Sequence, residues 1–137
     1  MPQEFRETRE VRRENISSSS NDIVRELAER QSRVGRIKED LMNNREATED
    51  FWDNAFAGYR NGLLGGGDRT LAGQIISRLT PIGQEYSSKK LLLDQSRQDN
   101  RIDEVTHRDR ELTLRAEYLA DRSLLLEKIA DENGFDQ

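Results

Sequence analysis

The chain has 137 residues, of which 33% are hydrophobic and 36% are charged, with 22 basic and 27 acidic side chains. A typical globular domain is about 45–50% apolar, so this composition argues against a compact monomer with a large core. The net charge of −5 argues against general nucleic-acid binding, and the absence of cysteine excludes disulfides and thiolate metal sites.

The N-terminal arm, residues 1–20, alternates Glu and Arg and contains few apolar side chains. A helix with so little apolar surface is marginal in isolation, so we expect the arm to become ordered on a partner. Ser and Asn side chains bond to nearby backbone groups and favour helix caps over helix interiors. The run Ser17–Asn21 therefore predicts a linker that ends in the N-cap of the next helix.

An amphipathic helix is expected over residues 21–54. Its apolar stripe repeats every seven residues and consists of Leu27, Val34 and Leu41, with Ile37 on the companion positions. This spacing is typical of a coiled-coil seam, although one amphipathic helix packed on any helical core gives the same pattern. Phe51 and Trp52 near its end are a candidate interface anchor, because large aromatic side chains dominate interface hot spots. Ordinary packing at a helix end is the alternative.

Residues 55–83 contain seven of the nine glycines and form a predicted Gly-rich elbow. Its triple glycine, Gly65–Gly67, should end a helix, after which Asp68 caps a short helix that Thr80–Pro81 stops. The elbow and anchor candidates are Phe51, Trp52, Phe56, Tyr59, Gly58, Gly62 and Gly66. The glycines spaced four apart favour a flexible hinge, with close helix packing or membrane contact as the alternatives.

A second long helix is expected over residues 84–132. Its seam follows two seven-residue grids, interrupted at Gln98, and consists of Leu91, Ile102, Val105, Leu112, Leu119 and Leu126. A helix of this span would be roughly 70 Å long at about 1.5 Å per residue, which is too long for a small globule. We therefore predict that it projects or bundles with other chains. Asn133–Gly134 ends it and leaves residues 133–137 as a tail.

No catalytic, cofactor-binding or metal-ligating constellation is predicted. His107 is the only histidine, and without cysteine a zinc site would need carboxylates for its other ligands. We expect His107 to be a solvated side chain. Carboxylates at helical spacing, such as Glu49 and Asp53, lie among arginines and are expected on a solvated face. The sequence thus predicts a non-enzymatic protein without a cofactor.

The overall character of the chain is short, cysteine-free, helical and charged, with the Gly-rich elbow Gly62-Leu63-Leu64-Gly65-Gly66-Gly67. In this character, and without a diagnostic motif, it resembles small helical virion proteins of tailed phages. The resemblance implies a portal-associated, head–tail or internal particle component located in the virion. Without it, we expect a cytoplasmic protein.

The sequence therefore predicts an all-α fold of elongated long helices, with coiled-coil-like seams joined by a Gly-rich elbow. The expected function is structural, a helical subunit that packs against other protein chains as a homo-oligomer, in a larger assembly, or both. Two alternatives stay open: a membrane-active or ejected delivery protein that uses residues 51–79, and a cytosolic helical adaptor. The chain carries no strong nucleic-acid signal, and membrane contact is the less favoured interpretation.

Overall fold

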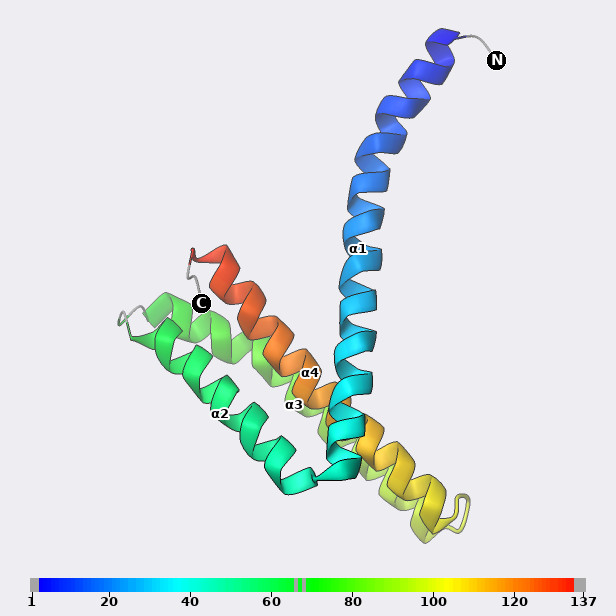
Figure 1. Cartoon of the computed structure of the whole chain (residues 1–137), viewed down its shortest axis with the longest axis vertical. Helices are drawn as coiled ribbons and strands as arrows, with labels where there is room; N and C mark the ends of the chain where they lie inside the picture. The colour runs from blue at the N-terminus through cyan, green and yellow to red at the C-terminus, as the bar shows by residue number, and fades with distance from the viewer. Residues whose placement is uncertain (1–2, 66, 68, 135–137) are drawn as a thin grey trace. The chain divides into compact units, whose positions relative to one another are not determined.

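The computed structural model describes residues 3–65, 67 and 69–134, with side chains described from residue 20 onward. These residues form no strand and four helices: α1 (Gln3–Asn43), α2 (Arg45–Leu64), α3 (Arg69–Gln98) and α4 (Glu104–Glu132) (Figure 1). The predicted all-α fold is confirmed, whereas its elongated form and its coiled-coil character stay predictions. The chain divides into two units, Met1–Ser32 and Arg33–Gln137.

Helix α1 continues through Ser17–Asn21 without a break, so the predicted linker between the arm and the next helix is wrong. Ser and Asn cost at most about 0.7 kcal/mol each in a helix relative to Ala, and the Glu, Arg and Leu residues on either side are better helix formers. Those neighbours therefore outweigh the preference of the serines for caps. The side chains of residues 1–19 lie outside the described part, so the expected ordering of the arm on a partner stays a prediction.

The helix predicted over residues 21–54 is interrupted at Asn44. Its backbone is extended, with φ −157° and ψ 93°, and its side-chain oxygen accepts a hydrogen bond from the backbone N–H of Ala47 at 3.1 Å. Thr48 Oγ1 in turn donates to the carbonyl oxygen of Asn44 at 2.7 Å. Asn44 is thus the N-cap of α2, because capping satisfies the first N–H groups of a new helix.

The triple glycine ends α2, as predicted. The helix stops at Leu64 with Gly65 as its C-cap, and Gly67 has φ +72°, which glycine adopts without the steric cost of a Cβ. Gly66 and the predicted N-cap Asp68 lie outside the described residues. The predicted end at Asn133–Gly134 is confirmed too, since α4 stops at Glu132 and Gly134 has φ +71°.

Pro81 lies inside α3, so the prediction of a short helix ending at Thr80–Pro81 is wrong. A proline in a helix interior costs about 3 kcal/mol, because it lacks an N–H and its ring crowds the preceding turn. Ile75 before the proline and Leu93 after it are both buried. The apolar packing of α3 on both sides of Pro81 therefore outweighs the local cost.

The helix predicted over residues 84–132 is two helices, because the chain turns between Gln98 and Glu104. Asn100 adopts φ 59°, a left-handed conformation that Asn tolerates better than most residues. The carboxylate of Asp103 accepts the Thr106 N–H at 2.7 Å and caps α4. Helices α3 and α4 consequently lie side by side as a helical hairpin (Figure 1).

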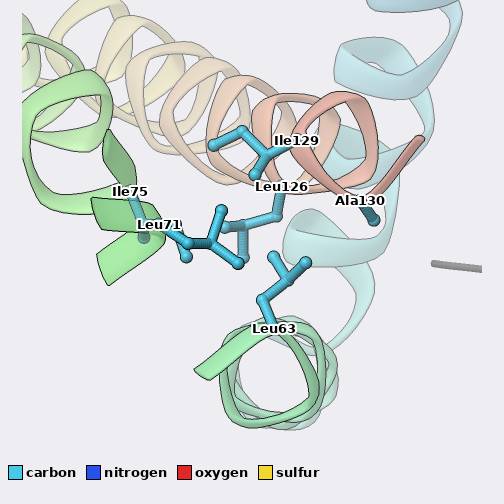
Figure 2. Packing of buried hydrophobic residues seen from close by; sticks show 6 residues of the cluster. All are labelled: Leu63, Leu71, Ile75, Leu126, Ile129 and Ala130. Carbon is cyan, nitrogen blue, oxygen red and sulfur yellow. The ribbon is translucent and has the colours of Figure 1, made fainter. Parts of the chain in front are cut away.

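Two apolar clusters form the core of the unit Arg33–Gln137. In the first, side chains of α2, α3 and α4 point toward one another (Figure 2): Leu63, Leu71, Ile75, Leu126, Ile129 and Ala130. In the second, the last turns of α1 pack on α4 through Ile37, Leu41, Ala116, Leu119 and Ala120. This unit therefore has its own buried core, which the low apolar content of the whole chain did not suggest.

Candidate interaction surface

A polar stripe joins α2 to α4 along one side of the core. Three α2 residues spaced four apart, and so on one face of the helix, each pair with an oppositely charged side chain of α4. The pairs are Arg45–Glu111 at 2.7 Å, Glu49–Arg115 at 2.7 Å and Asp53–Arg122 at 2.7 Å. Asp53 is exposed, as expected of a solvated face among arginines, whereas Glu49 is half-buried. Their partners are arginines 66 and 69 residues further along the chain.

The same arginines lie over aromatic rings. The guanidinium of Arg115 is 5.6 Å from the ring centre of Tyr86 and 5.3 Å from that of Tyr118, and Arg122 is 4.1 Å from Phe56. A planar guanidinium pairs with a carboxylate in its plane and stacks on rings with its faces. The stripe therefore binds α2 to α4 with charged side chains, whereas a chain with more apolar residues would use leucines for such a contact.

The predicted seam does not form one continuous surface. Four members are buried in the core of their own chain: Ile37, Leu41, Leu119 and Leu126. Three more are half-buried: Val34, Leu112 and Ile102. Only Leu27, Leu91 and Val105 are exposed. Leu119 and Leu126 are thus covered by helices of their own chain and cannot also contact another chain, whereas Leu91 and Val105 are left uncovered.

The aromatic candidates divide in the same way. Trp52 packs against the second cluster, and Phe56 and Tyr59 pack against the first. Phe51 meets Trp52 edge to face with ring centres 5.2 Å apart, but 63% of it is exposed. Within this group, Phe51 is the one aromatic whose surface is still largely available to another molecule.

Gly58 and Gly62 lie inside α2, so the hinge predicted at these two positions is wrong. A Cβ added at either position would meet nothing within 4 Å, so neither glycine permits a close approach of another helix in this fold. Gly66, the third member of the series, lies outside the described residues. Glycine is instead required at Gly67, because its φ is positive.

His107 is half-buried and bonded, whereas a solvated side chain was expected. Its Nε2 lies 2.8 Å from Asp94 Oδ1, and Lys90 Nζ donates to Asp94 Oδ2 at 3.1 Å. The hydrogen bond with His107, followed by that with Lys90, holds the pKa of the Asp94 carboxyl below its usual value. The pair joins α3 to α4 near their turn. Within the described ranges, no group of three His, Asp or Glu side chains is arranged to hold a metal ion.

Two exposed features each group several residues, and Met42, Phe51, Ile76, Leu91 and Val105 are exposed outside both. The first, which we call the α1 ridge, consists of Ile23, Val24 and Leu27, each more than half exposed. The second, the α3–α4 groove, is a shallow groove of about 410 Å³ lined by Lys89, Leu92, Leu93 and Ser96 of α3 and by Arg110, Thr113, Leu114 and Glu117 of α4. Sequence reasoning placed Leu27 in a seam, but it missed the groove, because the groove depends on the turn at residues 99–103.

Comparisons of the chain with protein-family models, with curated proteins and with solved structures find no match. Among the helices of the described residues, none combines the length and the apolar character that a membrane crossing requires. The features on which a function can be argued are therefore the α1 ridge, the α3–α4 groove and the internal packing that leaves them exposed.

Proposed function

We propose that this chain is a non-enzymatic structural subunit that associates with other protein chains through the exposed apolar side chains of α1. The observation that carries the proposal is the α1 ridge, where Ile23, Val24 and Leu27 are 57%, 62% and 56% exposed. Complete burial of a large aliphatic side chain stabilises by about 1.5–3 kcal/mol. Three such side chains on neighbouring turns supply several kcal/mol to an association.

The position of the ridge along the chain supports this proposal. Ile23 and Leu27 belong to the same seven-residue pattern as Val34, Ile37 and Leu41. The last three contribute to the second apolar cluster. The later repeats of this pattern pack on α4. The earlier repeats, which include Ile23 and Leu27, have the same spacing and are therefore suited to pack on another helix.

The internal role of the elbow segment favours the structural function over membrane insertion. Insertion of residues 51–79 would require Leu63, Leu71 and Ile75 to leave the first apolar cluster, where each is at most 5% exposed. The loss of those contacts would cost several kcal/mol before any lipid contact formed. The tailed-phage virion is the finer form of the structural proposal and rests on overall sequence character. Co-purification of the chain with assembled particles is its test.

The proposal is tested by sedimentation velocity on the purified chain over a dilution series. We expect a mass above that of the monomer at high concentration, falling on dilution. Leu27→Asp should leave a monomer at every concentration, because it places a charge at the centre of the ridge. Val105→Asp is the matched control, since Val105 is an exposed aliphatic residue of α4 at 78% and should leave association intact.

Circular dichroism of both variants should match the parent chain, because neither residue is buried. A parent chain that sediments as a monomer throughout, indistinguishable from Leu27→Asp, would contradict the proposal. A cytosolic adaptor that docks a single helix on a different protein predicts that monomeric result.

A further inference from the structure

The sequence contains two Asn-Gly pairs, Asn61–Gly62 and Asn133–Gly134. Glycine has no Cβ and a wide choice of backbone angles, so its backbone nitrogen can approach the side chain of the preceding asparagine closely. In such a pair the asparagine amide is therefore open to attack by its own backbone. Both asparagines are exposed, so water reaches each of them, and the local structure decides which one reacts.

The fold protects the first pair. Asn61 and Gly62 lie in the last turn of α2, where each N–H bonds to the carbonyl oxygen four residues back. Attack requires the ψ angle of Asn61 to leave its helical value and the N–H of Gly62 to be released, so the turn must open. The next residue, Leu63, is only 2% exposed and packs in the first apolar cluster. Opening this turn would therefore take a buried leucine out of the core.

The second pair has no such protection. Asn133 is the C-cap of α4, with φ −105° and ψ 10°. Its N–H is shared between the carbonyl oxygens of Ile129 at 3.1 Å and Ala130 at 3.2 Å, and the N–H of Gly134 reaches the carbonyl oxygen of Asp131 at 3.2 Å. These distances are at the long end of the usual range. All four residues from Asp131 to Gly134 are exposed, so this end can open without moving a buried side chain among them.

We propose that Asn133 deamidates spontaneously in the folded chain, whereas Asn61 is protected. The backbone nitrogen of Gly134 loses its proton and bonds to Cγ of Asn133, the Cγ–Nδ2 bond breaks, and ammonia leaves with that proton. Water then adds to either carbonyl of the cyclic imide and breaks its bond to the Gly134 nitrogen, which gives aspartate or isoaspartate. Water is the one reactant that the chain does not supply. This modification goes beyond the proposed function and does not depend on it.

The product should weaken the end of α4. Nδ2 of Asn133 donates to the carbonyl oxygen of Ile129 at 2.8 Å, and a carboxylate cannot donate this bond. The new charge lies at the helix C-terminus, whose partial charge is also negative. The last turn of α4, which is described in full, contains no basic residue, and Arg78 of α3 is already paired with Glu132 at 2.8 Å. Because Ile129 and Ala130 belong to the first apolar cluster, fraying of this turn loosens the core.

The test follows both asparagines in the full chain during incubation at mildly alkaline pH, with peptide mass spectrometry that separates the asparagine, aspartate and isoaspartate forms. We expect Asn133 to convert several-fold faster than Asn61 and to give both products. In urea the two sites should convert at similar rates, because unfolding removes the protection of Asn61. Equal rates in the folded chain would overturn the proposal. So would a folded chain that keeps Asn133 intact while the unfolded chain reacts.

Two variants of Asn133 separate the reaction from its consequence. Asn133→Gln should slow conversion at this site strongly, because the longer side chain must close a larger and less readily formed ring, and it should leave the rate at Asn61 unchanged. Asn133→Asp represents the aspartate product. Its urea midpoint should lie below that of the fresh parent chain, and the midpoint of the parent should fall toward it during incubation. An Asn133→Asp chain as stable as the parent would refute the weakening of α4.

Discussion

Replacement of Leu119 by alanine should destabilise the fold strongly. Leu119 is 0% exposed and packs in the second cluster with Ile37 and Leu41. The change removes three carbons, which at about 0.8 kcal/mol per buried CH₂ corresponds to about 2.4 kcal/mol of transfer free energy. Its neighbours Ala116 and Ala120 are too small to fill the space left behind, so the cavity adds to this loss. We expect a total of about 2–5 kcal/mol.

The matched control is Val105→Ala. Val105 lies two repeats earlier on the same seven-residue grid, but it is exposed, so its truncation should change the free energy of unfolding by less than about 0.5 kcal/mol. Urea unfolding followed by circular dichroism measures both changes. For an m-value of about 1–3 kcal/mol per molar urea, the smallest expected loss divided by the largest m-value means that Leu119→Ala should lower the midpoint by at least about 0.7 M.

The measurement must be made where the chain is monomeric, which a midpoint independent of protein concentration verifies. Equal midpoint shifts for Leu119→Ala and Val105→Ala would refute the reasoning. That result would mean that the two positions are equivalent, as on one uninterrupted helix over residues 84–132, and that the turn at residues 99–103 does not form.

Three further changes probe the helix ends and the α3–α4 hairpin by the same urea assay. Asn44→Ala should cost about 1 kcal/mol through the lost N-cap bond to Ala47, whereas Asn43→Ala should cost little; equal effects would speak against capping. Gly67→Ala should cost about 1–2 kcal/mol because of its φ of +72°, but Gly62→Ala should stabilise by about 0.5–1 kcal/mol, since its Cβ has free space. A loss at Gly62 would indicate a contact there. The lowered pKa of Asp94 adds stability above the ordinary carboxyl pKa of about 3.9, and that stability is lost as the pH falls through the folded-state value. Asp94→Asn should therefore lower the midpoint at pH 7, and the difference should shrink as the pH is lowered below the ordinary carboxyl pKa; a difference that stays constant in acid would contradict the role of its charge.

The fold class and two of the helix ends could be predicted from the sequence because they depend on local signals. Gly65–Gly67 and Asn133–Gly134 end helices wherever they occur, since only glycine adopts the required backbone without strain. The expected stop at Thr80–Pro81 used the same kind of local argument and was wrong. Packing on both sides of Pro81 is a tertiary effect that no local rule contains.

The turn at residues 99–103 was hidden by the pattern that normally reveals helices. The leucine grid runs through it, with Leu91 before and Val105 after, so periodicity alone predicts one helix. The available signals were the break at Gln98 and the capping residue Asp103. Their weight becomes clear only when α3 and α4 lie side by side, and the groove between them could not be anticipated without that turn.

The charged composition misled the sequence argument for a related reason. A content of 36% charged residues was taken to leave too few apolar side chains for a core. However, two arginines of α4 bind carboxylates of α2, and one of them stacks on the ring of Phe56. Low apolar content therefore does not prevent the unit Arg33–Gln137 from having a core. It means that few apolar side chains remain for the surface once the core is filled. The core does not explain the aliphatic residues that stay exposed in spite of this scarcity, which lie on the α1 ridge and at Ile76, Leu91, Leu92 and Val105. The same seven-residue pattern builds the fold where another helix covers it, and it leaves aliphatic side chains exposed where none does.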